Sequence, residues 1–167
     1  MKYHVVVTGS RPDKGMVDGK ERYLPIPEAN SAFIFEVLDR IPRDNYVALY
    51  HGMAEGVDSV ADAYAFERRI RVRQFPADWS PKKQGERYDA TAGHKRNEFM
   101  IRTALKNAYG KNDEQVVVVA FTNKPLVDSK GTNACVTYAK SKNVAHVQHF
   151  ILPVTSDNLV TTEGQPF

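Results

Sequence analysis

Short β-branched stretches that alternate with segments of helical periodicity constrain the fold of this chain more than any other feature. The five stretches are YHVVVT near residue 3, YVALY near 46, RVRQF near 71, QVVVVAF near 115 and AHVQHFIL near 145. Such alternation is typical of a parallel sheet with helices packed on its faces. We therefore predict an α/β, three-layer fold with a mostly parallel sheet of about five strands flanked by helices.

The segments between these stretches carry apolar residues at helical spacing. The pattern i, i+3, i+4, i+7 runs from Val57 to Ala65, and a similar stripe runs from Asn97 to Ala108. A first helix is expected over about 29–41, ended by Pro42, and a last helix over about 132–141. Two connections, 12–28 and 76–90, are longer than the fold requires. They are either functional lids or simple excursions.

Composition bounds the class of protein. With 167 residues, 42% of them hydrophobic and 26% charged, the chain suits one domain, which we place at 1–152 with a peripheral tail at 153–167. No apolar run approaches the ~20 residues that cross a bilayer, and the amino terminus is typical of a strand rather than a signal peptide. A single cysteine, Cys135, suits a reducing compartment. These features favour a cytoplasmic protein without a membrane partner.

Polar and glycine residues gather in the segments that follow the predicted strands. These segments are TGSR at 8–11, HGMAEGVD at 51–58, FPADW at 75–79 and the stretch from Thr122 to Thr132. In a parallel sheet they all lie at one edge, where ligands bind. The sequence therefore predicts a ligand site at the carboxyl ends of the strands.

Each of these segments has a functional and a purely structural interpretation. Gly9, Ser10 and Arg11 suit a phosphate, or they form an ordinary turn with an exposed arginine. The glycine-rich turn at 51–58 and the helix start at Gly131 both offer free N–H groups to an anion, or serve geometry and capping alone. Trp79 can stack on a base or cover the sheet edge.

Several other motif classes are not found. No G-x-G-x-x-G follows the first strand, and Lys130 precedes its glycine rather than following it as in a P-loop. His146 and His149 are three residues apart in a predicted strand, so they point to opposite faces and do not suit a metal site. Cys135 is interpreted as a core residue. No cofactor or metal is expected.

Taken in order, VTGSR, HGMAEGVD, FPADW, AGHKRNEFM, VVVAF and KGT resemble the SLOG superfamily, most closely its YspA-like, cpYpsA-related branch of bacteria and phages. The resemblance covers about 2–150 and implies a Rossmann-like, nucleotide-binding domain. It adds Arg96 and Asn97 to the predicted pocket. The candidate ligand-binding residues are then Gly9, Ser10, Arg11, His51, Gly52, Gly56, Asp58, Trp79, Arg96, Asn97, Thr122, Gly131 and Thr132.

One departure from the superfamily bears on catalysis. The related lysine-decarboxylase-like, cytokinin-activating enzymes carry P-G-G-x-G-T-x-x-E, and the glutamate belongs to their catalytic site. Here Cys135 stands at that position and Ser129 and Lys130 replace glycine-rich residues. Cleavage of an N-glycosidic bond would need another carboxylate. The candidate acids at the predicted edge are Glu55, Asp58 and Asp78.

Three functional hypotheses follow. The first is a protein that binds a phosphorylated nucleotide or nucleotide-derived ligand, such as an ADP-ribose-like or NAD-derived molecule, as sensor, carrier or sponge. The second is a nucleotide N-glycoside hydrolase that uses Asp58 or a neighbouring acid. The third is single-strand DNA binding through Arg68–Arg73 and Lys82–Lys83, although a net charge of +3 does not by itself indicate nucleic acid. The oligomeric state stays open, a homo-oligomer being one expectation.

Overall fold

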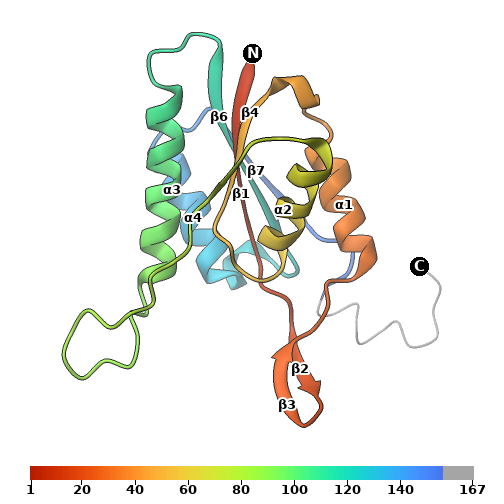
Figure 1. Ribbon diagram of the computed structural model, residues 1–167, viewed down its shortest axis with the longest axis vertical. Coiled ribbons are helices and arrows are strands. Elements are labelled where there is room, and N and C mark those ends of the chain that lie inside the picture. The colour runs from red at the N-terminus through yellow and green to blue at the C-terminus, as the bar shows by residue number, and fades with distance from the viewer. Residues whose placement is uncertain (156–167) are drawn as a thin grey trace.

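A five-stranded parallel sheet with two helices on each face forms the body of the protein in the computed structural model, which describes residues 1–155 (Figure 1). The strands are β1 (Lys2–Gly9), β4 (Tyr46–His51), β5 (Val72–Gln74), β6 (Glu114–Thr122) and β7 (His146–Ile151). The helices are α1 (Glu28–Leu38), α2 (Val57–Arg68), α3 (Ala92–Ala108) and α4 (Lys130–Ser141). The predicted three-layer, Rossmann-like α/β fold is confirmed.

The strand order is β5-β4-β1-β6-β7, and all neighbouring strands of this sheet are parallel. The chain therefore moves outward from β1 in one direction, then returns across it through α3 to build the other half. The order reverses between β1 and β6. Loops that leave these two strands diverge at that point and open a crevice at the carboxyl edge of the sheet, where open α/β folds bind ligands.

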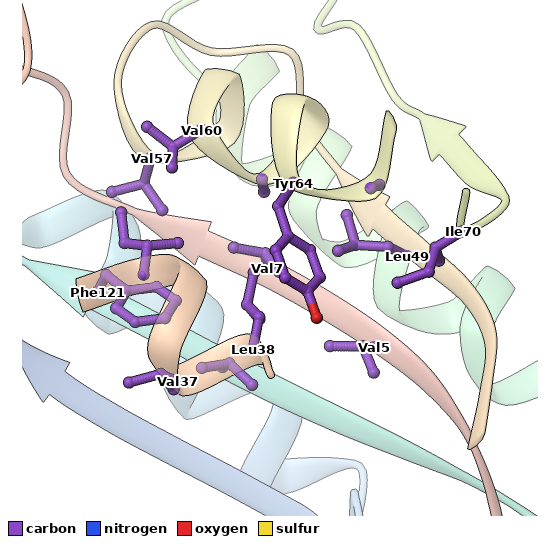
Figure 2. Packing of buried hydrophobic residues seen from close by; sticks show 14 of the residues in the cluster. Val5, Val7, Val37, Leu38, Leu49, Val57, Val60, Tyr64, Ile70 and Phe121 are labelled. Atoms are coloured by element: carbon purple, nitrogen blue, oxygen red, sulfur yellow. The ribbon is translucent and has the colours of Figure 1, made fainter. Parts of the chain in front are cut away.

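The two faces of the sheet have separate cores because strand side chains alternate in direction. Val5 and Val7 of β1 point toward α1 and α2, where they join Tyr64 and Phe121, as Figure 2 shows. Val6, between them, points to the opposite face and packs with residues of α3 and α4. This two-sided burial explains why the central strands are continuous apolar runs rather than alternating ones.

The first helix differs from its prediction at its carboxyl end. We expected it to end at Pro42, whereas α1 ends at Leu38 and is capped by Asp39. Single turns follow, in which the N–H groups of Arg40 and Ile41 donate to carbonyls three residues back. The residue before a proline avoids the helical conformation. Pro42 therefore disfavours continuation of the helix through Ile41.

The long connection 12–28 contains a β-hairpin that the sequence reading did not predict. Its strands, β2 (Lys14–Val17) and β3 (Lys20–Tyr23), pair antiparallel around Asp18 and Gly19. Both turn residues have positive φ, 51° and 74°, as a tight hairpin turn requires. In Figure 1 this hairpin and the long loop between β5 and α3 both project from the carboxyl edge of the sheet.

The first residues of the predicted tail, 153–155, are tied to α1. The side-chain amide of Asn30 donates to the Val154 carbonyl oxygen at 3.0 Å, and its oxygen accepts the Val154 N–H at 2.8 Å. Val154 is buried. The rest of that tail, 156–167, lies outside the described residues. Within residues 1–155, no helix is long and apolar enough to cross a membrane.

Candidate functional site

The carboxyl edge of the sheet holds a cavity of about 640 Å³ at the reversal of strand order. Its walls come from the loop after β1, the start of α2, the loop before α3, the first turns of α3, the segment from Asn123 to α4, and the hairpin. A volume of this size lies within the range of small-molecule sites. The cavity is therefore the candidate functional site.

Nine of the thirteen residues predicted to bind a ligand line this cavity. They are Gly9, Ser10, Arg11, Asp58, Trp79, Arg96, Asn97, Gly131 and Thr132. The topology brings them together from five separate segments. Four of these were predicted from the strand ends, and the family resemblance added the segment with Arg96 and Asn97. Whether they contact a ligand stays a prediction.

The other four predicted residues, His51, Gly52, Gly56 and Thr122, are not among the cavity-lining residues. His51 is buried, with Nε2 2.7 Å from an Asp62 carboxylate oxygen and Nδ1 accepting the Met53 N–H at 3.0 Å. The Thr122 hydroxyl lies 2.7 Å from His149 Nε2 and donates to the Lys124 carbonyl at 2.6 Å. These side chains stabilise the loops behind the cavity wall.

The two glycines of the 51–58 turn allow close contacts behind this wall. A Cβ at Gly52 would overlap the Arg96 guanidinium. Gly56 has a φ of 96°, and a Cβ there would lie 2.7 Å from Pro12 and 2.8 Å from the Ser10 carbonyl oxygen. Glycine is therefore required at position 56 by its backbone conformation and the approach of Ser10 and Pro12, whereas at position 52 it leaves room for the Arg96 guanidinium.

Asp58 lies at the start of α2 and shapes the turn that precedes the helix. One of its carboxylate oxygens accepts the N–H groups of Gly52 at 3.0 Å and Ala54 at 3.1 Å. Burial raises the pKa of Asp58, while the backbone donors and the charges of His51 and Arg96 oppose that rise. The side chain is thus a buried carboxyl group that faces the cavity and holds the turn in place.

Arg96 is half-buried in α3 and joins three segments around the cavity. Its Nη1 donates to the carbonyl oxygen of Gly52 and, at 3.3 Å, to that of Phe75, while Nε donates to the Asn97 side-chain oxygen at 2.8 Å. Desolvation lowers the pKa of Arg96 from its ordinary value, and the neighbouring Asp58 carboxylate opposes this. The guanidinium is held in a fixed position beside the cavity.

The start of α4 forms another wall. Ser129 is the N-cap residue, yet its hydroxyl makes no capping hydrogen bond, and the side chain is buried. Among residues 1–155, Ser129 Oγ is the only buried side-chain nitrogen or oxygen without a hydrogen-bond partner. Buried hydroxyl groups normally find a partner because leaving one unsatisfied is costly. This hydroxyl lies at the cavity, next to the free N–H groups of the first helical turn.

Cationic side chains outnumber acidic ones along the cavity. The cations are Arg11, Lys14, Arg96, Lys124 and Lys130, against Asp13, Asp58 and Asp128. With the partial positive charge at the start of α4, this makes the cavity suited to an anionic ligand.

Several cavity residues were not predicted from the sequence. Lys14 and Tyr23 come from the hairpin, for which the Asp18–Gly19 pair was the available signal. Ser129 was noted only as a replacement of glycine. Its lack of a partner is a three-dimensional property that no local pattern reveals.

The other two candidate acids do not line the cavity. Glu55 is exposed, and Asp78 is exposed and binds Lys82 Nζ at 2.7 Å. The Lys82 hydrogen bond lowers the pKa of Asp78, so this carboxylate stays ionised on the surface. Cys135 is buried, and burial raises the pKa of its thiol to about 11, as expected of an unreactive core residue. No cluster of three potential metal-ligating side chains occurs within residues 1–155.

Comparisons with known proteins bear on the first half of the chain. No curated protein and no solved structure matches the chain significantly. One family model matches from β1 to the beginning of the loop before α3, so it includes the segments around Ser10, Asp58 and Trp79 but not α3 or α4. Residues 3–81 match the YspA, cpYpsA-related SLOG family.

Proposed function

We propose that the protein binds a phosphorylated nucleotide or nucleotide-derived ligand, of the ADP-ribose or NAD-like kind, at the carboxyl edge of its sheet. Ser129 is the observation that carries this proposal. Its buried hydroxyl has no partner within residues 1–155 and stands at a helix start, where N–H groups and the helix dipole favour an anion. A phosphate oxygen would satisfy the hydroxyl and accept from the N–H groups around it.

The charge of the cavity supports the same ligand class. Lys124 and Lys130 line the cavity and lie close in sequence to Ser129. Arg96 lines the same cavity from α3, where its bond to the Gly52 carbonyl fixes the guanidinium. A phosphate placed among these groups would gain charge-assisted hydrogen bonds. A neutral ligand would gain no charge-assisted hydrogen bonds from these cations.

Calorimetry tests the proposal. We expect AMP, ADP-ribose or NAD to bind the unchanged protein, and Ser129→Ala to weaken that binding, whereas Ser141→Ala at the other end of α4 should not. Mass spectrometry of small molecules released on denaturation should find a nucleotide if one co-purifies. Absence of binding by every member of this panel at millimolar concentration would contradict the proposal.

A second candidate function is hydrolysis of a nucleotide N-glycosidic bond, and the position of Asp58 favours it. Of the three candidate acids, this one lines the cavity, and burial raises its pKa. A carboxylate there could stabilise positive charge on the ribose or activate water. Asp58→Asn can still accept the N–H groups of the turn but lacks the charge. Release of free base from a nucleoside monophosphate should be lost in this variant, and unchanged turnover would exclude the assignment.

Two of the cations suggested for single-strand DNA binding, Arg68 and Lys82, are engaged elsewhere. Arg68 donates to both carboxylate oxygens of Asp39, at 3.0 and 2.9 Å, and Lys82 binds Asp78. Neither lines the cavity. These contacts favour a structural role for both side chains over contacts with a phosphate backbone.

A further inference from the structure

The aromatic wall of the cavity supplies a second subsite. Trp79 is the single tryptophan of the chain and lines the cavity with 41% of its surface exposed. An indole with this much open surface inside a cavity offers an apolar face and a π-system to a ligand. Every nucleobase can stack on such a side chain, because stacking does not depend on the hydrogen-bonding groups of the base.

The position of Trp79 is fixed by its own loop. Its carbonyl oxygen accepts the Asp89 N–H at 2.9 Å, which closes the loop at its neck beside the start of α3. The edge of its six-membered ring lies against Gly93, where a Cβ would be 3.4 Å from Cη2. Tyr88 packs edge-on, with ring centroids 6.4 Å apart. The indole is therefore held in place before any ligand binds, which lowers the entropy cost of stacking.

A cation lies over this ring. The guanidinium carbon of Arg11 is 5.7 Å from the centroid of Trp79, and Arg11 Nη1 donates to the Tyr23 hydroxyl at 3.1 Å. Arg11 thus links the hairpin to the loop that carries Trp79. A planar guanidinium beside an indole is a combination that stacks on bases and also donates hydrogen bonds to them.

A second cavity, of about 100 Å³, is the competing place for a base. It lies behind the loop after β1 and has an apolar lining that includes Leu24, Ile34 and Leu152. The amide of Asn30 also lines it, but this amide is already bonded to Val154 through both its nitrogen and its oxygen. Arg11 lines both cavities, but the second is smaller than ordinary small-molecule sites and has less room for a base than the cavity that Trp79 lines.

We propose that the bound nucleotide lies with its phosphate at Ser129 and its base on Trp79 beside Arg11, so that Trp79 determines the preference for a nucleotide over a sugar phosphate. This orientation rests on the proposed function. Both residues line one cavity from different segments of the chain. The two ends of the ligand are then recognised by different chemistry, a hydroxyl and helix start for the anion and an indole for the base.

The experiment compares AMP with ribose 5-phosphate, which lacks the base. Affinities are measured by calorimetry for the unchanged protein, Trp79→Ala, Ser129→Ala and the control Phe66→Ala, which removes an exposed phenyl group on α2. We expect AMP to bind the unchanged protein at least about tenfold more tightly than ribose 5-phosphate. Trp79→Ala should abolish this ratio, Trp79→Phe should keep most of it, and Ser129→Ala should weaken both ligands while keeping the ratio.

Fluorescence gives an independent readout because the signal comes from Trp79 alone. AMP should change its emission more than ribose 5-phosphate does. A ratio that survives Trp79→Ala, or emission that AMP leaves unchanged, would overturn the orientation while leaving nucleotide binding intact. Failure of AMP to bind a protein that binds ADP-ribose would also overturn it. Failure of the whole nucleotide panel would instead contradict the proposed function.

Discussion

Two buried polar groups in this protein differ in how they are satisfied. Near the amino ends of the strands, His4 of β1 lies 2.8 Å from the Tyr50 hydroxyl and 2.6 Å from a Glu114 carboxylate oxygen, and Asn107 donates to the same hydroxyl at 3.0 Å. At the carboxyl edge, the Ser129 hydroxyl has no partner in the described part of the chain. The first cluster is complete without any other molecule, so it serves the fold. The second group is incomplete, which points to a ligand.

The largest expected effect comes from breaking the complete cluster. His4→Ala should lower the free energy of unfolding by about 2–4 kcal/mol, because it removes a buried ring and leaves the Glu114 and Tyr50 side chains without their partner. Urea denaturation measures this. His146→Ala, which removes an exposed histidine on β7, should have little effect. A loss below about 0.5 kcal/mol for His4→Ala would remove the structural role assigned to the cluster.

Ser129→Ala should give the opposite pattern. Because its hydroxyl makes no capping bond, its removal should change the free energy of unfolding by less than about 0.5 kcal/mol, whereas loss of a working N-cap usually costs about 1 kcal/mol. Affinity for AMP should fall about tenfold, which corresponds to about 1.4 kcal/mol. If stability falls and affinity does not, the Ser129 hydroxyl serves the helix, and its contrast with the His4 cluster is contradicted.

The smallest expected effect concerns acid. The His4 hydrogen bond holds the pKa of Glu114 below its ordinary value. A carboxyl group with a lowered folded-state pKa contributes stability above its unfolded-state pKa, and that stability is lost as the pH falls through the folded value. Unfolding free energies should therefore decline more steeply in acid for the unchanged protein than for Glu114→Gln. Parallel pH profiles for the two proteins would contradict this.

The architecture was largely predictable because burial on both faces leaves a strong local signal. Five β-branched stretches produced five parallel strands, of which β1, β4 and β6 are continuous buried runs. The loops after the strands met at one edge as the topology requires. The hairpin was missed because its strands, KGMV and KERY, are short and largely polar, so they have no core-facing pattern.

The site was predictable only to the level of segments. His51 ends a strand at the ligand edge, as expected, but its ring bonds to Asp62, which lies on the next helix. Such pairings between distant positions leave no trace in local spacing. The role of Ser129 could not be predicted for the same reason. A hydroxyl without a partner is recognised only when all neighbouring side chains are placed.

A crystal structure of the protein grown with AMP tests the central claim most directly. It should place a phosphate oxygen at hydrogen-bond distance, about 2.7 Å, from Ser129 Oγ, at the start of α4. A nucleotide whose phosphate lies elsewhere, with the Ser129 hydroxyl still unpartnered, would contradict the account.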